Sequence, residues 1–353
     1  MTDRKLIYEA YDPDLAEEIQ WFWLHRLVRD SFNLIVGDPK VGKGTIISWL
    51  ISQASRGLLP GDLKGKPCSV GVIGYEDSWR KVWTPRLKAV DAPKGMVFNL
   101  KWDNGDQIRI REDRDYVKWL IEKLELGLVY IDSLFDNLGL RTNSNLQKEV
   151  REDLSPLTYI SEDSKCTVLS TLHPNRHANT FENWLPNSIA FQGVARCILG
   201  LCRHPADPET RVLVVARNNY GDEGHGMQFN IASQAVKVKS LRSGLWVTKK
   251  IGVVVNREPS SILIDDLIGG KRAGRQSILD ELLMDSAITN GGMPAKEIIA
   301  AAKVAGFGES MVRRRKNVLG IQHRKEGDAW VWWAEKPSPP VEEEDDEYDE
   351  RDD

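Results

Sequence analysis

A glycine-rich loop between a predicted strand and a predicted helix carries the residues with the clearest chemistry. Apolar residues 34–36 precede it, and residues 45–51 have the periodicity of a helix. The glycines let consecutive N–H groups point into one concavity, and the helix directs the positive end of its dipole there. The sequence therefore predicts a polyphosphate site made by Gly37, Asp38, Pro39, Lys40, Val41, Gly42, Lys43, Gly44 and Thr45.

Lys43 and Thr45 have different predicted tasks in this loop. The lysine would reach β- and γ-phosphates, and the threonine an α-phosphate or the ligand shell of Mg²⁺. Gly44 stands where the usual pattern has the hydroxyl that ligates magnesium. Either Thr45 replaces that hydroxyl or water holds most of the metal. A glycine turn without function is the alternative interpretation.

Polar residues end three further predicted strands. Glu76 follows residues 69–75, Asp132 ends residues 128–132, and His173 follows residues 167–172. Hydrolysis of ATP needs a base for water, a carboxylate that orients the metal, and positive charge near the γ-phosphoryl group. We assign Glu76 as the base, Asp132 as the metal ligand and His173 as a γ-phosphate sensor. A histidine that only caps a strand is the alternative for His173.

Strands and helices alternate up to residue 195, which predicts an α/β fold with a mostly parallel sheet covered on both faces. Four further segments predict strands with little helix, and we expect them to extend the sheet at its edge as a meander. They are residues 197–201, 211–216, 228–231 and 244–255.

An ordered set of motifs resembles the RepA-type hexameric replicative helicases, ring ATPases of plasmids and phages with a RecA-like P-loop NTPase core. The resemblance covers roughly residues 20–235. Its motifs are G-x-P-x-x-G-K at residues 37–43, Tyr75-Glu76-Asp77 with Arg86-Leu87, Val129-Tyr130-Ile131-Asp132, Thr171-Leu172-His173, Ser188-Ile189-Ala190 with Ala195-Arg196, and Asn219-Tyr220-Gly221.

The resemblance implies roles for individual residues. It supports the roles of Lys43, Glu76, Asp132 and His173 and places Arg86 with the nucleotide-binding residues. Arg196 would be the arginine finger that completes a neighbour's site, and Arg217 is the second candidate. A surface ion pair is the alternative for each arginine. Gly44 departs from the pattern, as does a single histidine where some relatives show two.

Two long polar loops are expected to hold single-stranded DNA, because RecA-like rings grip strands with the loops after the metal strand and the sensor strand. They are residues 137–145 and 175–184, with Arg141, Asn143, Arg176 and His177 as candidate contacts and Phe181 and Trp184 able to stack on bases. We discount a zinc pair of His173 and His177, because Pro174 argues against a helix there.

Residues 275–336 predict three helices and a hairpin, a pattern that resembles the winged-helix tails of phage ATPases. Residues 271–336 hold twelve Lys/Arg against eight Asp/Glu, a net charge of +4. A protein-docking domain with solvated charges is the alternative. The candidate contacts to duplex DNA are Arg313, Arg314, Arg315 and Lys316 on the third helix and Arg324 and Lys325 on the hairpin.

The composition, 41% hydrophobic and 28% charged, is ordinary for a soluble protein, and no apolar run suits a secretion signal or a membrane span. We expect a cytoplasmic protein without a membrane partner. Its four cysteines form no Cys-x-x-Cys pair, so neither disulfides nor zinc are indicated. The net charge is −4, but residues 342–353 hold ten acids and one arginine, or −9, which leaves +5 elsewhere.

The predicted organisation is a lead-in over residues 1–30, a RecA-like ATPase core over 31–256, a linker over 257–274, a winged helix over 275–336 and a disordered acidic tail over 337–353. We expect an ATP- and Mg²⁺-dependent DNA motor, a ring-forming, hexameric replicative helicase. The acidic tail could recruit replication proteins or compete with DNA for the basic surfaces, and a role in solubility alone is the preferred alternative. The alternatives are a RecA-like recombinase or mediator that coats single strands, and an ATP-controlled DNA-binding regulator without motor activity.

Overall fold

A nine-stranded sheet forms the centre of the first of two units. The computed structural model describes residue 8 and residues 10–138, 147–175, 181–185, 188–222, 225–305, 307–327 and 329–334. The chain divides into residues 1–270 and residues 271–353. Within the described residues, no helix is both long and apolar enough to cross a membrane.

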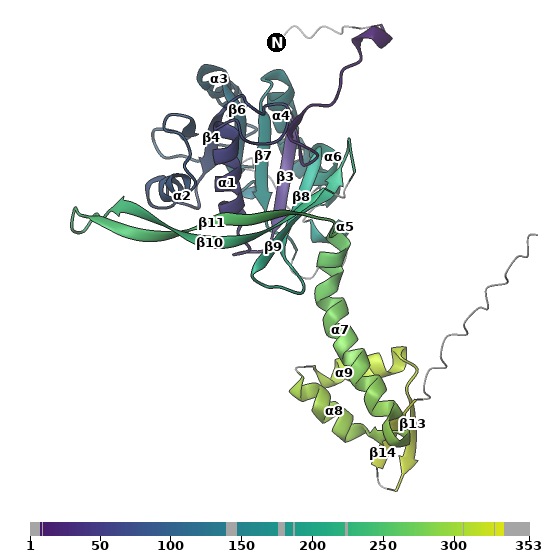
Figure 1. Ribbon diagram of the computed structural model, residues 1–353. Coiled ribbons are helices and arrows are strands. Elements are labelled where there is room, and N and C mark those ends of the chain that lie inside the picture. The colour runs from purple at the N-terminus through teal and green to yellow at the C-terminus, as the bar shows by residue number, and fades with distance from the viewer. Residues whose placement is uncertain are drawn as a thin grey trace, which may run out of the picture. The chain divides into compact units, whose positions relative to one another are not determined.

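The strand order of the large sheet is β11-β10-β9-β8-β3-β7-β6-β4-β5 (Figure 1). The six strands from β8 to β5 are parallel, and β9 to β11 continue the sheet antiparallel. The strands are β3 (Phe32–Gly37), β4 (Ser69–Gly74), β5 (Val97–Asn99), β6 (Leu126–Asp132), β7 (Thr167–Leu172), β8 (Cys197–Arg203), β9 (Thr210–Asn218), β10 (Gly226–Lys239) and β11 (Trp246–Ser260). The predicted mostly parallel α/β sheet with an antiparallel edge is confirmed.

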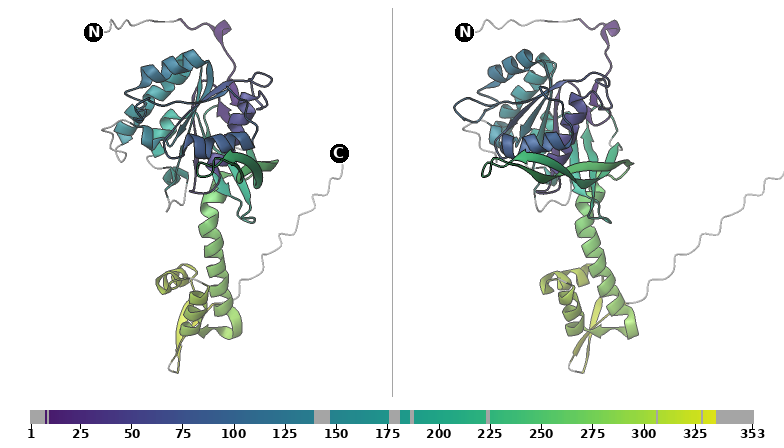
Figure 2. Two further views of the ribbon diagram at one scale, coloured as in Figure 1. Left: turned by 90° about the vertical axis from the view of Figure 1, so that its left-hand side faces the viewer. Right: turned by 60° about the vertical axis from the view of Figure 1, so that its left-hand side comes forward.

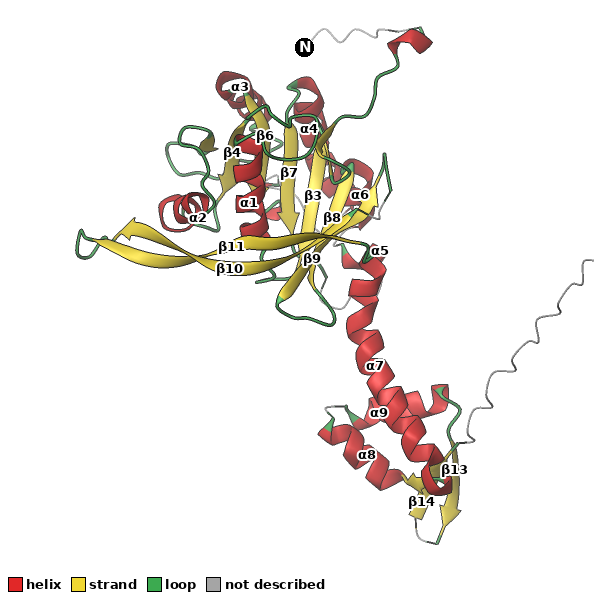
Figure 3. Cartoon of the chain, viewed as in Figure 1, coloured by secondary structure: helices red, strands yellow, loops and turns green. Residues whose placement is uncertain are grey.

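Helices cover both faces of this sheet (Figures 2 and 3). One face packs against α3 (Arg114–Leu124), α4 (Gln147–Asp163) and α6 (Ser188–Val194), and the other against α1 (Lys43–Ser55) and α2 (Thr84–Ala89). Short helical segments are η1 (Pro13–Leu15), η2 (Trp79–Trp83), η3 (Phe135–Asn137) and α5 (Phe181–Trp184). Every residue of β3 is buried, because a central parallel strand has helices on both of its sides.

The hairpin of β10 and β11 is longer than the sequence predicts. β10 pairs with β9 only through residues 227–230, whereas its remainder pairs only with β11 as far as Lys239. This outer part packs beside α1 and α2 (Figure 1). The sequence pattern missed it because most side chains there are exposed, so no apolar alternation marks the strand.

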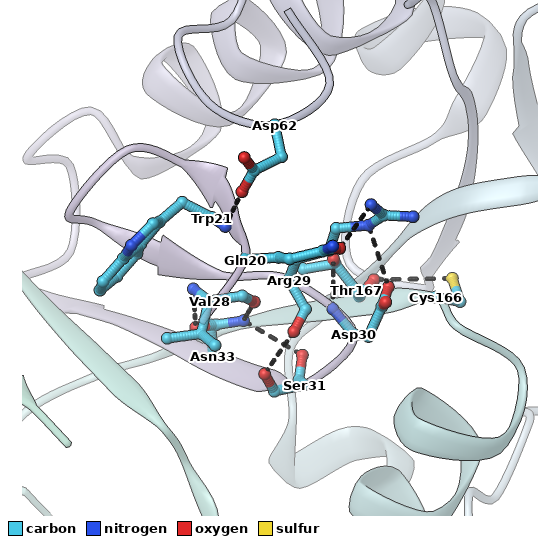
Figure 4. A network of polar contacts seen from close by, with 10 residues as sticks. All are labelled: Gln20, Trp21, Val28, Arg29, Asp30, Ser31, Asn33, Asp62, Cys166 and Thr167. Carbon is cyan, nitrogen blue, oxygen red and sulfur yellow. Dashed lines mark hydrogen bonds and ion pairs between the residues drawn. The ribbon is translucent and has the colours of Figure 1, made fainter. Parts of the chain in front are cut away.

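The N-terminal segment forms a small hairpin of β1 (Trp21–Trp23) and β2 (Leu27–Val28) that joins the core at the amino end of β3. Buried Asn33 donates to the carbonyls of Val28 and Ser31 at 2.9 and 3.1 Å and accepts from the N–H of Val28 at 3.0 Å (Figure 4). The N–H of Asp30 donates to Thr167 Oγ1, at the start of β7. These hydrogen bonds satisfy a buried amide side chain and fix the hairpin to the sheet.

The second unit holds three helices and a three-stranded sheet of order β12-β14-β13. They are the second part of α7 (Ile264–Ile288), η4 (Thr289–Gly291), β12 (Met293–Pro294), α8 (Ala295–Val304), α9 (Glu309–Val318), β13 (Gln322–Glu326) and β14 (Ala329–Trp333). Leu283, Ile298, Val312 and Trp332 lie in its core. These elements are the helices and hairpin expected from the sequence. Where the sequence predicts a linker, residues 257–274, the structure has the end of β11 and the start of α7.

Candidate nucleotide site

The phosphate loop lies between β3 and α1, at the carboxyl edge of the parallel strands. Gly42 has φ of +113°, which only glycine adopts readily, and it precedes the first turn of α1. A Cβ on Gly37 would lie 2.7 Å from the carbonyl oxygen of Leu201. Both glycines are therefore required by the path of the backbone, as expected for a loop that turns its N–H groups inward.

Lys43 points back into the loop. Its Nζ donates to the carbonyl oxygens of Gly37 at 2.6 Å and Asp38 at 3.1 Å and lies 3.1 Å from His173 Nδ1. Burial lowers the pKa of Lys43 to about 8, although Asp132, Asp38 and Glu76 oppose the shift. The pKa of His173 is also lowered, first by burial and then by the charge of Lys43. Both lowered pKa values fit an arrangement in which the imidazole of His173 is neutral and its Nδ1 accepts a hydrogen bond from the ammonium group of Lys43.

Asp132 ends β6 and is fixed by a chain of hydroxyl groups. Thr171 Oγ1 lies 3.0 Å from Asp132 Oδ1 and 3.0 Å from the hydroxyl of buried Tyr130. Burial raises the pKa of Asp132, and the hydrogen bond from Thr171 lowers it in part. The carboxylate is therefore oriented by β7, the neighbouring strand, and keeps acceptor capacity for a metal-bound water or a cation.

Glu76 follows β4, with its side chain exposed, on the same edge of the sheet. Partial burial of its carboxyl, with repulsion from Asp132, Asp136 and Asp77, raises its pKa. A raised pKa makes a carboxylate a better proton acceptor at neutral pH. Glu76, Lys43, Asp132 and His173 all line one cavity of about 540 Å³, so the structure brings together the residues that the sequence singled out.

Arg86 reaches the same cavity from α2. Its Nη1 lies 2.6 Å from Asp77 Oδ2, in a pair that is about one third exposed. A Cβ on Gly44 would lie 2.9 Å from Arg86 Nη1. The glycine that departs from the usual phosphate-loop pattern therefore leaves room for a guanidinium directly beside the first turn of α1.

Mg²⁺ fits this site only together with a nucleotide. Among the described residues there is no cluster of three or more His, Cys, Asp or Glu side chains that could hold a metal ion. Mg²⁺ commonly uses one or two carboxylates, substrate phosphates and water. Asp132 is placed to supply the carboxylate and Thr45, which also lines the cavity, a hydroxyl.

The comparison with known families agrees with this geometry. Residues 9–179 match the family model of an AAA domain. The matched stretch contains the phosphate loop, Glu76, Arg86, Asp132 and His173. A search of curated proteins finds no match. Together with the parallel sheet, the AAA domain supports an ATPase with a RecA-like core.

Arg196 and Arg217 lie outside the matched stretch and away from their own chain's phosphate loop. Arg196 immediately precedes β8. In the parallel pair of β3 and β8, Gly37 lies opposite Leu201, which is five residues after Arg196, or about 16 Å along the strand. Arg196 lies 3.8 Å from Glu162, and Arg217 donates to Gln192 at 2.7 Å. Neither arginine can serve the site of its own chain at that position, so a catalytic role for either requires a second subunit.

The candidate single-strand contacts Arg141, Asn143, Arg176 and His177 lie outside the described residues. The described residues that precede them in the chain, up to Leu138 and up to Asn175, follow β6 and β7. The predicted stacking of Trp184 on bases is wrong, because Trp184 is 6% exposed and packs in the core, and Phe181 is partly buried against the same cluster. Both rings therefore pack against the apolar core instead of standing exposed to a DNA base.

The described cationic side chains of α9 point in different directions. Arg315 makes two hydrogen bonds of 2.5 Å to Asp280 of α7, and Lys316 is 9% exposed with its Nζ 5.6 Å from the ring centre of Trp332. Arg313 is 59% exposed and pairs with Glu309. Consecutive helical residues point about 100° apart, so the prediction that all four face DNA is wrong for Arg315 and Lys316. The side chain of Arg314 is outside the described residues.

Arg324 and Lys325 of β13 are exposed, as the sequence predicts for the hairpin. Arg324 Nε lies 2.5 Å from Glu326 Oε1, and its Nη2 donates to the carbonyl of Gly291 at 3.0 Å. Lys325 extends from the same strand.

Sequence reasoning gave no site role to several residues that line the nucleotide cavity, among them Ile231 and Tyr130. Ile231 of β10 lines it, and its Cδ1 would lie 2.8 Å from a Cβ on Gly42. Tyr130 also lines it, through the hydroxyl chain to Asp132. Tyr130 precedes Asp132 by two residues, so the alternation of side chains along β6 is a signal that could have found it. No sequence signal brings Ile231, which is far along the chain, to the loop.

Proposed function

We propose that the protein is an ATP-hydrolysing motor on DNA, most simply a ring-forming replicative helicase. The contact between Lys43 and His173 carries the proposal. The lysine belongs to the phosphate loop, whereas the histidine directly follows β7 and precedes the predicted strand-binding segment, residues 175–184, by two positions. A change in the phosphates at Lys43 would thus act directly on the segment that the sequence assigns to single-strand contact.

The hydrolysis step uses groups already placed in the cavity. Glu76 takes a proton from water as the water oxygen bonds to the γ-phosphorus and the bond to the ADP oxygen breaks. Lys43 and Arg86 stabilise the charge that develops on the phosphoryl oxygens. Mg²⁺ bound to the nucleotide would offset the negative charge of the β- and γ-phosphates, with Asp132 and Thr45 as its protein partners.

Assembly into a ring, expected to be a hexamer, would add an arginine from a neighbouring subunit to Lys43 and Arg86, which line the cavity of the same chain. The position of Arg196 and Arg217 at the far edge of the sheet supports a role toward a neighbouring subunit. Single-stranded DNA would pass the loops that follow β6 and β7, and duplex DNA would meet the second unit. Residues 342–353, with net charge −9, would recruit other replication proteins.

The deciding experiment combines ATP hydrolysis with unwinding of a forked duplex. The wild-type protein should hydrolyse ATP faster with single-stranded DNA and separate the fork. Glu76→Gln should bind ATP but lose turnover roughly a hundredfold or more, because a general base is removed. ATP hydrolysis that single-stranded DNA stimulates without unwinding of the fork would favour the strand-coating recombinase or mediator. A rate of hydrolysis that DNA does not change would favour the regulator.

A further inference from the structure

A strongly basic groove lies between η2 and the outer part of the β10–β11 hairpin. We call it the hairpin groove and define it by the cations Arg80, Lys81, Lys101, Lys239 and Lys249, with Trp79 beside them. Its volume is about 1150 Å³. This exceeds the usual range for small-molecule sites, so a polymer is the better fit.

The five cations come from separate parts of the chain and converge without compensation. Arg80 and Lys81 follow β4, Lys101 follows β5, and Lys239 and Lys249 belong to the two hairpin strands. All five are exposed, no carboxylate lines the groove, and none of the five forms an ion pair with the residues that the structure describes. A merely solvated charge run would lie on one segment, whereas here the fold brings like charges together.

Specific contacts hold the two walls of the hairpin groove against each other. Lys249 Nζ donates to the carbonyl of Lys81 at 3.3 Å, and Lys88 Nζ donates to the carbonyl of Lys237 at 2.8 Å. Lys88 Nζ also lies 5.5 Å from the ring centre of exposed Trp246. The hairpin therefore stays beside η2 despite the repulsion between the cations.

The groove occupies the edge of the sheet where ligands bind in this kind of fold. Trp79 to Lys81 and Lys101 follow the carboxyl ends of β4 and β5, the edge that also carries the phosphate loop. Glu76 and Asp77 immediately precede this part of the groove in the chain. Trp79 is half-buried, because it packs partly against the apolar core, and its remaining surface lines the groove.

We infer that the hairpin groove binds single-stranded nucleic acid. The cations neutralise successive phosphates, and Trp79 offers a face on which an unpaired base stacks. A duplex would hide its base faces from the ring. This site goes beyond the proposed function, because it adds a contact for the strand apart from the loops after β6 and β7.

The test measures binding of a fluorescent oligo-dT to the full-length protein without nucleotide, over a series of salt concentrations. Arg80→Ala/Lys101→Ala/Lys239→Ala should lower affinity at least tenfold at low salt. It should also reduce the log–log salt slope by about 2, since each phosphate contact with a single strand contributes about 0.7. Lys64→Ala/Lys66→Ala is the matched control, because these exposed lysines precede β4 and so lie at the opposite edge of the sheet.

An unchanged slope in the triple variant, or an equal loss in the control, would overturn the inference. So would a peptide of residues 342–353 that displaces oligo-dT at a lower concentration than unlabelled oligo-dT does, because the groove would then suit an acidic peptide. Thermal unfolding and ATP binding check that each variant folds. The binding is measured without hydrolysis, so its outcome stands apart from the outcome of the unwinding assay.

Discussion

Gly44→Ala should weaken nucleotide binding while leaving the fold nearly as stable as before. The new Cβ would lie 2.9 Å from Arg86 Nη1, and ordinary contact begins at 3.4 Å. The guanidinium must therefore move by about 0.5 Å, away from the position in which it pairs with Asp77 at 2.6 Å.

The expected magnitudes follow from these contacts. The ion pair is about one third exposed, so straining it costs at most about 0.5 kcal/mol of stability, and the better helix propensity of alanine offsets part of that. A hydrogen bond from Arg86 to a phosphate is worth about 1.5–3 kcal/mol. Losing about 1 kcal/mol of it lowers affinity roughly fivefold.

A double-mutant cycle read by titration with a fluorescent, non-hydrolysable ATP analogue isolates this effect. Gly44→Ala should cost affinity in the wild-type background and almost nothing in Arg86→Ala, because the clashing group is then gone. Gly193→Ala is the matched control, since nothing lies within 4 Å of its added Cβ. An equal loss in both backgrounds, or none in either, would refute the assignment of Arg86 to the nucleotide.

Three other outcomes are expected. Because burial lowers the pKa of Lys43 to about 8, ATP affinity should fall as pH rises above about 8, and calorimetry in several buffers should show proton uptake on binding that Lys43→Arg lacks. Without nucleotide, the free energy of unfolding should rise between about pH 8 and pH 10.5, because in this range Lys43 keeps its proton in the unfolded chain and has lost it in the folded one. Mixing Arg196→Ala with Lys43→Ala subunits should restore some ATPase activity, whereas no recovery despite co-assembly would exclude Arg196 as the residue acting in trans. In the second unit, Arg315→Ala should lower the melting temperature, because it removes the double hydrogen bond to Asp280. Arg313→Ala should leave the melting temperature unchanged and weaken duplex binding. The reverse pattern would contradict the two orientations.

The sequence alone determined the phosphate loop and the edge at which chemistry takes place. Gly37, Gly42 and Lys43 lie within seven residues, so local backbone geometry suffices to predict their cavity. Glu76 and His173 follow apolar strands and Asp132 ends one, and parallel strands bring their carboxyl ends to one edge. These features depend on short-range pattern and on one general property of α/β sheets.

Only the tertiary structure decided which side chains face one another. The pair of Arg86 and Asp77 over Gly44 depends on how α2 packs beside α1, and the burial of Trp184 depends on the opposite face of the sheet. Arg315 and Lys316 turn inward because neighbouring helical positions point about 100° apart and Asp280 and Trp332 lie within their reach. The hairpin groove brings together cations up to 169 positions apart in the chain, from Arg80 to Lys249. The sequence does not predict this proximity, because the side chains of the paired strands are mostly exposed and show no apolar alternation.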